Sequence, residues 1–502
     1  MKQTKPTNKS RPWLSVVFIF LALWVMAPSG WANEATAPAG VQVLARVEVP
    51  GSLGDLNLPV FSDQIDGARK HYALAIATQA QLQMAGVSFR VIDEYLPGTR
   101  YLIALERRDG ARTRAALATT VLYDDGRRII VKESPGLADA LAEMGFALKL
   151  MSETPMILAP TALEPRVKKL MEFAFTPDPL VSQMIGKVTQ GAVNSNISGL
   201  SGESPVTVDG TPHTITTRYT NSGTPLHKAT QYIFEQLQGM GLNTSFQSWT
   251  YASLAGRNVV GELRGASLPD EIVLLTAHLD DLPTTGTAPG ADDNGSGSAA
   301  LLTAANIMSR YRFQRTIRFI FFTGEEQGLH GSASYAGSVA SQKIVAVLNL
   351  DMIAYSTQTA PVQRLHTRAP ANPGYAADLT IANTFVDVVN NYGIAGNLQP
   401  TITSDGETAS DHSSFWDKGF AAILAIEDDY SNFNPNYHTS SDKLQYLNLA
   451  YCTAHVKASV GTGAHLARTL AKVVPAPWLE LLLLSWEKLT NSPYGFRNVS
   501  FN

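Results

Sequence analysis

Residues 271–281 read EIVLLTAHLDD, an apolar run that ends in a histidine and two nearby aspartates. The segment Glu271–Thr276 is apolar at successive positions, which is typical of a strand buried on both faces of a sheet. His278, Asp280 and Asp281 follow where such a strand would end. Ligands of α/β sheets bind beyond the carboxyl ends of the strands, so this segment indicates a functional site.

Three further strands of the same kind are expected, over Thr316–Phe322, Ile344–Leu350 and Ala421–Ile426. Helices are expected between the strands, over His227–Gly239 and after Gly295. This alternation predicts an α/β fold in which helices sandwich a mostly parallel central sheet. The residues that follow each strand would then meet at one edge of that sheet.

The residues after these strands form a set of imidazoles and carboxylates without a thiolate. The set comprises His278, Asp280, Asp281, Asp292, Asp293, Glu325, Glu326, Asp351, Glu427 and His438. Adjacent carboxylates at a buried strand end need a cation, a proton or dense hydrogen bonding, because each unpaired charge costs several kcal/mol. The one cysteine, Cys452, cannot build a thiolate zinc site. Nitrogen and oxygen ligands alone suit a catalytic zinc, and the set is too large for a single ion.

Six segments, in this order, resemble the zinc aminopeptidase family that includes the secreted bacterial leucyl aminopeptidases and, more distantly, glutamate carboxypeptidase II. They are His278–Asp280, Gly290–Gly297, Gly324–Leu329, Leu350–Met352, Ser410–His412 and Asn434–Thr439. The resemblance covers roughly residues 216–471 and implies the zinc exopeptidase fold.

The resemblance also implies two zinc ions per chain with five ligands. His278 and Asp351 would bind one ion, and Glu326 and His438 would bind the other. Asp293 would bridge the two ions. A water shared by both ions would then become hydroxide near neutral pH and attack the substrate carbonyl.

Two further acids would complete the machinery implied by the resemblance. Glu325 would be the general base that takes the proton of the water and then gives it to the leaving amine. Asp280 would orient the imidazole of His278. The family has a cis peptide bond after the bridging aspartate, which falls here at Asp293–Asn294.

One position departs from the family. The secreted bacterial enzymes carry a tyrosine three residues before the Ser-Asp-His triplet, where this chain has Glu407. The donor to the tetrahedral intermediate is therefore open between Tyr437 and Tyr355. We expect Glu407 to face solvent, the alternative being that it binds a substrate ammonium group. Asp411 and His412 are expected to be structural, because the triplet opens a helix whose backbone N–H groups its serine or its aspartate would cap.

Residues 1–32 have the three parts of a secretory signal peptide. Basic residues come first, the apolar run Trp13–Met26 follows, and a small residue, Ala32, closes the segment. The run is shorter than the roughly 20 residues that span a bilayer. The sequence therefore predicts an exported protein, periplasmic or secreted, without a membrane span after the signal peptide is removed.

The remaining chain is expected to form an accessory domain, a linker, a catalytic domain and a tail. Residues 33–158 are predicted to be a small α/β accessory or pro-domain, residues 159–204 a linker with one or two helices, residues 205–472 the zinc peptidase domain, and residues 473–502 the C-terminal tail. The accessory domain is expected to repeat a strand–helix–strand unit, first over Val43–Val49, Tyr72–Ala85 and Gly86–Ile92, then over Arg128–Val131, Leu137–Met144 and Gly145–Leu150.

The formal net charge is −4, which gives no overall basic field for binding nucleic acid. We predict an exported zinc exopeptidase that hydrolyses the N-terminal peptide bond of peptides with a free N-terminus. Two other reactions on the same fold stay open, carboxypeptidase-like release of an acidic C-terminal residue and cyclisation of an N-terminal glutamine. A non-catalytic binding ectodomain is the alternative from another class. The sequence makes no prediction of oligomeric state.

Overall fold

The computed structural model describes residues 40–158 and 175–472. The expected signal peptide, the C-terminal tail and residues 159–174 of the expected linker lie outside the described residues. Across the two described ranges, we find no helix with the length and apolarity needed to cross a bilayer.

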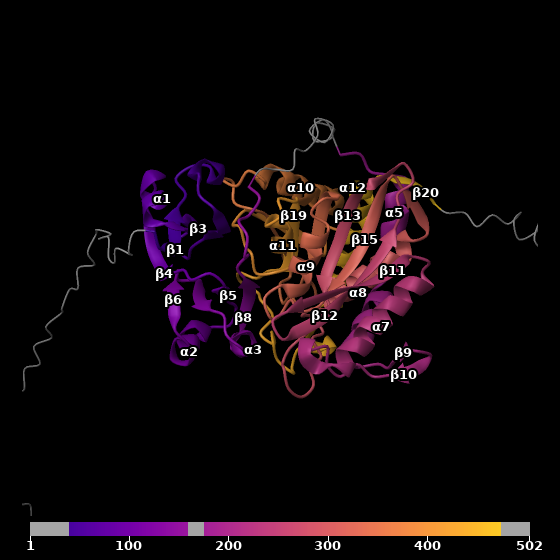
Figure 1. The fold of residues 1–502 in the computed structure, drawn as a ribbon. Coiled ribbons are helices and arrows are strands. Elements are labelled where there is room, and N and C mark those ends of the chain that lie inside the picture. The colour runs from indigo at the N-terminus through magenta and orange to yellow at the C-terminus, as the bar shows by residue number, and fades with distance from the viewer. Residues whose placement is uncertain (1–39, 159–174, 473–502) are drawn as a thin grey trace, which may run out of the picture. The chain divides into compact units, whose positions relative to one another are not determined.

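The N-terminal unit, residues 42–158, is built on two four-stranded antiparallel sheets (Figure 1). The first sheet has the order β2-β3-β1-β4 and contains β1 (Gln42–Glu48), β2 (Val60–Ile65), β3 (His71–Thr78) and β4 (Phe89–Glu94), with η1 (Leu53–Leu56) and α1 (Gln79–Met84) between them in the chain. The second sheet has the order β6-β7-β5-β8 and contains β5 (Tyr101–Glu106), β6 (Val121–Asp124), β7 (Arg128–Lys132) and β8 (Phe146–Leu150), with α2 (Ala111–Ala118) and α3 (Leu137–Glu143). The two strand orders match, with β1 to β4 corresponding to β5 to β8, so the unit repeats internally. The repeat differs from the predicted one, because Arg128–Val131 lies in β7, the counterpart of β3, and not in the counterpart of the strand predicted over Val43–Val49.

The helix expected over Tyr72–Ala85 is wrong in its first half, where β3 forms instead. One face of β3 packs its alanines, Ala73, Ala75 and Ala77, into the core of the first sheet. The other face packs Tyr72, Leu74 and Ile76 against the second sheet. Because both faces are buried, the strand lacks polar alternation, and its alanines favour a helix in a sequence-based reading. Only α1 is helical in this segment.

The rest of the described chain, residues 178–472, surrounds an eight-stranded mixed sheet in the order β11-β12-β15-β13-β16-β19-β17-β18. Its strands are β11 (Asn243–Tyr251), β12 (Leu254–Leu263), β13 (Leu268–His278), β15 (Arg315–Phe322), β16 (Lys343–Leu350), β17 (Val362–His366), β18 (Gln399–Thr403) and β19 (Ala422–Glu427). The neighbours β15, β13, β16 and β19 are all parallel and include the four strands expected from the sequence. We call these residues the large-sheet unit.

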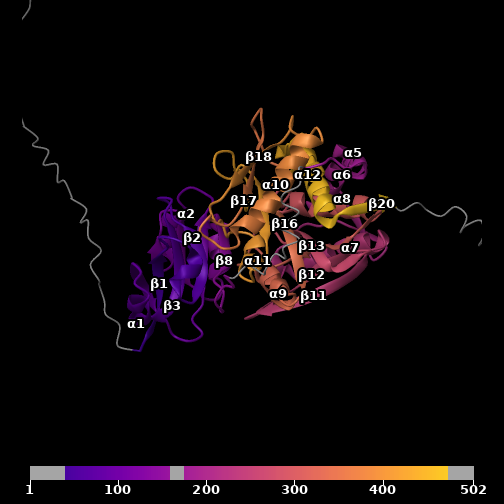
Figure 2. The ribbon, with the colours of Figure 1, turned by 90° about the horizontal axis from the view of Figure 1, so that it is seen from above.

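Helices cover both faces of the large sheet (Figure 2). Six helices pack into the larger core: α5 (Pro179–Gly186), α6 (Gln190–Leu200), α7 (Thr224–Gly239), α8 (Gly295–Met308), α10 (Tyr375–Asn391) and α12 (Leu449–Ala467). Two pack into the core on the other face: α9 (His330–Ser338) and α11 (His412–Trp416). Small outlying elements are β9 (Val206–Val208), β10 (Thr211–His213), η2 (Thr220–Ser222), β14 (Tyr311–Phe313), η3 (Leu444–Tyr446) and β20 (Thr469–Lys472).

Helices α5 and α6 lie in the range expected to be a linker. Their buried side chains Val181, Met184, Val193 and Ile197 belong to the same apolar core as the strands of the large sheet. A linker between domains makes few such contacts. We therefore propose that the catalytic unit begins near residue 178 rather than at 205.

Candidate active site

The five expected metal ligands meet at the carboxyl edge of the central parallel strands. His278 is the last residue of β13, Asp351 follows β16 directly, and Glu326 follows β15. Asp293 lies in the loop before α8, and His438 lies in the loop between β19 and α12. Parallel strands place their carboxyl ends on one edge, which is why residues so distant in sequence converge.

The side chains of these residues are within contact distance of one another. His278 Nε2 lies 3.2 Å from Asp351 Oδ1 and 3.2 Å from Asp293 Oδ1. His438 Nε2 lies 3.3 Å from Asp293 Oδ2 and 2.8 Å from Glu326 Oε2. The two oxygens of Asp293 therefore face two different histidines, each of which has a second carboxylate beside it.

The residues fit a metal centre on two counts. Three buried atoms, Asp293 Oδ2, Glu326 Oε1 and His438 Nε2, form no hydrogen bond of good geometry among the described residues, although His438 Nε2 lies close to both carboxylates. Ligand atoms of His278, Glu325 and Asp351, and likewise those of His278, Asp293 and Glu326, lie within 4.8 Å of one another. A divalent cation would give these buried atoms the partner that protein groups do not supply.

The raised pKa values of Glu326 and His438 also fit a bound cation. Burial, followed by the nearby Asp293 carboxylate, raises the pKa of Glu326 to about 8. Burial alone would lower the pKa of His438, but Glu326 and Asp293 raise it to about 10. These shifts share one cause, which is several carboxylates in a place from which water is excluded, and a bound cation relieves it.

The start of α8 holds the Asp293 loop against β16. The peptide bond Asp293–Asn294 is cis, as the resemblance implies. Asn294 Nδ2 donates to the Leu350 carbonyl at 2.8 Å, and Asn294 Oδ1 accepts from the Gly297 backbone N–H at 2.9 Å. A Cβ atom at Gly297 would lie 2.5 Å from the Leu350 carbonyl oxygen, so close packing requires glycine there.

Neighbouring groups hold two of the ligands in position. His278 Nδ1 donates to the backbone carbonyl of Asp280 at 3.1 Å, whereas the Asp280 carboxylate is 3.8 Å away, too far for a hydrogen bond. That carboxylate instead accepts from the Thr220 hydroxyl at 2.8 Å. Ser410 donates to Asp351 Oδ2 at 2.6 Å, a contact that sequence analysis did not predict.

Glu325 lines the same cavity as the ligands and is 6% exposed. Burial first, and then the Glu326 and Asp351 carboxylates, raise its pKa well above the ordinary value, although His278 opposes the shift. Tyr437 also lines this cavity, and its ring stacks on His438 with centroids 3.6 Å apart. Tyr355, the other tyrosine expected to be a donor, is not among the residues that line the cavity.

Two buried acids beneath the site, Asp292 and Asp442, make supporting contacts that sequence analysis did not predict. Asp442 Oδ2 accepts from the backbone N–H of Asp293 at 2.9 Å, and Asp292 accepts from Asn434 Nδ2 at 2.9 Å. Burial raises the pKa of Asp292 to about 6. The sequence showed Asp292 and Asn434 inside motifs, but their mutual contact joins loops 142 positions apart and leaves no local pattern.

Arg218 was also missed, although it is fully buried under the site. Its guanidinium donates to the carbonyls of Leu279, Pro289 and Gly290 at 2.6 to 3.0 Å and lies 3.2 Å from Asp281. It therefore joins the end of β13 to the loop that carries Asp293. Carbonyl acceptors have no side-chain signature, so no motif marks this arginine.

The expectation that Glu407 faces solvent is wrong, because its side chain is fully buried. Its Oε2 accepts from Arg127 at 2.8 Å and from Arg128 at 3.4 Å, both in the N-terminal unit. Burial opposes ionisation, but these arginines hold the pKa of Glu407 down at about 2. The residue thus serves as one half of an ion pair between the two units, which lie in a single compact body.

His366 belongs to the same buried network, and its ion pairs should make the free energy of unfolding fall as the pH rises above neutral. Burial disfavours its charge, but Asp405 and Asp429, at 2.9 and 3.3 Å, raise the pKa of His366 to about 10. In an unfolded chain histidine titrates near 6.5, so the stabilisation is complete below about pH 6.5 and is lost as the pH rises to about 10. We expect the free energy of unfolding to fall by a few kcal/mol over this range, measured by urea denaturation. His366→Asn should flatten that fall, and an unchanged slope would contradict the ion pairs.

Asp411 stands at the N-cap position of α11, but its side chain makes no capping hydrogen bond, so the aspartate of the triplet, one of the two expected options, does not cap the helix. Its carboxylate is buried, and burial raises its pKa to about 7. The single O–H donor of Ser413 lies between the carbonyl oxygens of Thr408 and Ser410, at 2.8 and 2.9 Å, and ties the start of α11 to the preceding loop. The triplet therefore serves the site mainly through Ser410.

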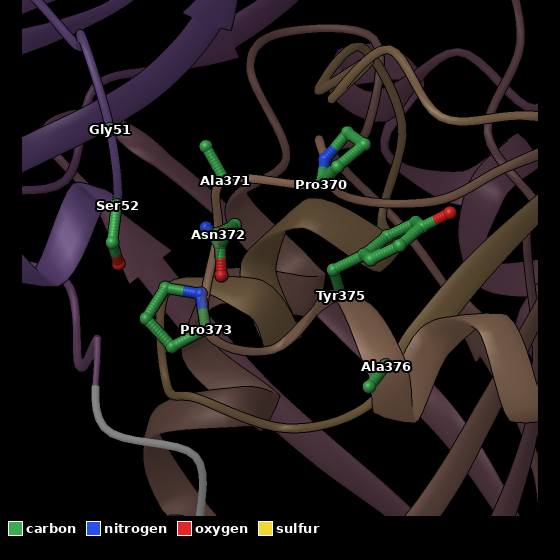
Figure 3. A pocket seen from close by; sticks show the side chains of 8 residues that line it. All are labelled: Gly51, Ser52, Pro370, Ala371, Asn372, Pro373, Tyr375 and Ala376. Carbon is green, nitrogen blue, oxygen red and sulfur yellow. The ribbon is translucent and has the colours of Figure 1, made fainter.

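A separate pocket lies where Gly51 and Ser52 approach the segment before α10 (Figure 3). Its lining comprises Gly51, Ser52, Pro370, Ala371, Asn372, Pro373, Tyr375 and Ala376. None of these residues offers a carboxylate, an imidazole or a thiol. The pocket therefore has no ligands for a metal and is not a second candidate for the active site.

The model of peptidase family M28 matches residues 258–461. A probable leucine aminopeptidase of Trichophyton verrucosum is 30% identical over 296 residues, which cover 55% of this chain and 74% of that protein. Leucine aminopeptidase 1 of Aspergillus fumigatus is 29% identical over 271 residues, which cover 50% of this chain and 67% of that protein.

Two solved structures share the fold. The LapA aminopeptidase of Legionella pneumophila aligns with a TM-score of 0.55 at 19% identity, over 75% of this chain and all of that one. LapB of the same organism aligns with a TM-score of 0.54 at 18% identity, over 73% of this chain and 99% of that one.

Proposed function

The chain belongs to peptidase family M28 and is a zinc-dependent aminopeptidase, and from this premise we propose that it is an exported enzyme that uses two zinc ions and Glu325 as general base. The observation that carries the proposal is the position of Asp293, whose two oxygens face His278 and His438 separately. A carboxylate in that position can join two ions. His278 with Asp351 would hold one ion, and His438 with Glu326 the other.

Zinc bound by these residues would supply Lewis acidity, lowering the pKa of a water molecule and polarising the substrate carbonyl. Glu325 is the acid in this cavity that the proposed ligand set leaves free. Burial and the neighbouring carboxylates raise the pKa of Glu325 above its ordinary value, which makes it a stronger proton acceptor than an exposed glutamate. Glu325 takes the proton of the attacking water and gives it to the amine nitrogen that leaves.

Tyr437 is the proposed donor to the oxygen that becomes negative in the transition state. It lines the cavity beside Glu325 and Glu326, and the Phe433 and His438 rings pack against it. A neutral phenol can donate a hydrogen bond there, and burial raises the pKa of Tyr437 well above its usual value, so it stays protonated. Asp280 keeps His278 in position, chiefly through its backbone carbonyl.

The proposal predicts hydrolysis of substrates with a free amino end. We expect the purified protein to release p-nitroaniline from leucine p-nitroanilide and to leave N-acetyl-leucine p-nitroanilide intact, followed by absorbance. Chelation of the metal should abolish the reaction, and added zinc should restore it. Cleavage of the acetylated substrate, or of neither substrate at full zinc content, would overturn the assignment.

The same assay separates the two alternatives on this fold. A carboxypeptidase-like enzyme would act on an N-acetylated peptide with a free acidic C-terminus, and a glutaminyl cyclase would convert an N-terminal glutamine without breaking a peptide bond.

Export is proposed from residues 1–32 and is tested by N-terminal sequencing of the protein recovered outside the cytoplasm, where we expect a start near residue 33.

A further inference from the structure

The N-terminal unit contributes two residues to the wall of the metal cavity. Arg107 directly follows β5, and Ala147 lies in β8. Both line the cavity together with His278, Asp293, Glu325 and Glu326. The cavity therefore has a cationic side chain that does not come from the large-sheet unit.

Arg107 is held in place but not saturated. Its Nη1 donates to Asp429 Oδ2 at 2.7 Å, and its guanidinium carbon lies 5.4 Å from the centre of the Phe433 ring. Among the described residues the bond to Asp429 is the one hydrogen bond of this side chain, which leaves other N–H groups of the guanidinium to donate. Asp429 also pairs with His366, so its one negative charge is shared between His366 and Arg107.

The N-terminal unit contacts His438 and Tyr437 through atoms that do not face the proposed metal position. His438 Nδ1 donates to the carbonyl of Ala142 at 2.6 Å, whereas Nε2 faces Asp293 and Glu326. Arg108 donates to the backbone carbonyl of Tyr437. A hydrogen bond to the outer nitrogen fixes the ring of a metal-binding histidine, so the unit supports the geometry of the site.

Buried ion pairs fix the unit in this position. Glu407 pairs with Arg127 and Arg128, and Asp417 pairs with Lys149 at 2.9 Å. Each pair joins a carboxylate of the large-sheet unit to a cation of the N-terminal unit. Breaking a buried pair leaves an uncompensated charge, so these contacts favour a permanent wall over a removable cover.

We propose that Arg107 is a substrate-binding residue of this aminopeptidase and that it binds a carboxylate group of the peptide. The inference rests on the proposed function of the cavity. A guanidinium presents paired N–H donors that match the two oxygens of a carboxylate, and partial desolvation strengthens such bonds. The carboxylate belongs either to the C-terminus of a dipeptide or to an acidic side chain, and the substrates tell the two apart.

The test compares four substrates with wild-type protein and Arg107→Met. Leu-Gly and Leu-Gly-amide differ in the C-terminal carboxylate, and Glu-Gly-amide and Gln-Gly-amide differ in the side-chain carboxylate. We expect Arg107→Met to lower kcat/KM for either Leu-Gly or Glu-Gly-amide by about 10- to 100-fold, mainly through KM. For the matched substrate that lacks the carboxylate, kcat/KM should stay within about threefold of the wild-type value. Arg107→Lys should recover part of the loss, because it keeps the charge without the paired donors.

Lys132→Met is the control, since it removes a cation of the same unit that pairs with Asp93 within that unit at 2.8 Å and does not line the cavity. It should leave both substrate ratios unchanged. If the ratios of Arg107→Met also stay unchanged, the proposed role of Arg107 is wrong. Equal acceleration of all four substrates by Arg107→Met would also contradict the proposed role, because loss of a binding residue should slow its substrate. Failure of the wild-type protein to cleave any of them would instead contradict the proposed function.

Discussion

Replacing Glu325 by Gln is expected to lower kcat by about 10³-fold while zinc content and KM stay at wild-type values. Glutamine has the size and shape of glutamate but cannot accept the proton of the attacking water. Glu325 is 6% exposed and lies near the carboxylates of Glu326 and Asp351, so bulk water is poorly placed to act in its stead. Steady-state kinetics with leucine p-nitroanilide, together with metal analysis of the same sample, would measure both quantities.

Glu326→Gln provides the contrast, because the adjacent residue is a proposed ligand that faces His438 at 2.8 Å. We expect this variant to lose zinc as well as activity, and to recover part of the activity when zinc is added in excess. If Glu325→Gln keeps more than about a tenth of the activity at full zinc content, Glu325 is not the general base.

The large sheet and its functional edge could be predicted because each depends on a local signal. Strands β13, β15, β16 and β19 are buried on both faces and read as short apolar runs. Once four such strands are parallel, the residues that follow them must share an edge, whatever their distance in sequence. The convergence of His278 and Asp351 follows from this topology, whereas Asp293 also needs the contacts that hold the loop before α8.

The contacts that complete the site could not be predicted, since their partners are distant backbone groups or residues of the other unit. The acceptor for His438 is the carbonyl of Ala142, 296 positions away. Glu407 and its partner Arg127 are 280 positions apart, and a lone glutamate before a motif gives no sign of burial. The local patterns predict where an element lies, whereas these pairings depend on how the two units pack.

Strand β3 shows a different limit, in which composition outweighs pattern. Its sequence alternates alanine with larger apolar residues, and alanine has the highest helix propensity. The strand pairs on both sides, with β1 and β2, and two cores cover its faces. Tertiary burial decided the conformation there, and only the sheet neighbours could have indicated it.

Asp293→Asn is expected to remove both zinc ions and to lower activity by at least about 10³-fold. Asparagine has nearly the same volume, and its backbone N–H can still donate to Asp442 at the wild-type distance of 2.9 Å, so the loop should persist. It offers only one oxygen, however, whereas the aspartate presents one oxygen to each histidine. It also brings an amide N–H₂ group, which cannot bind a cation, into the position of the second oxygen.

Metal analysis by mass spectrometry of the native protein would show whether the two ions depend on this one carboxylate. We expect two zinc ions in the wild type, fewer than one in Asp293→Asn, and one in Asp351→Asn, because of the two proposed histidine ligands Asp351 pairs with His278. Asp281→Asn is the control: this buried acid pairs with Arg218 at 3.2 Å instead of facing a histidine, so the variant should lose stability but keep both ions. Two zinc ions retained in Asp293→Asn would rule out the bridge. An equal loss of zinc in the Asp293 and Asp351 variants would rule it out as well, because Asp293 would then hold no more ions than Asp351 does.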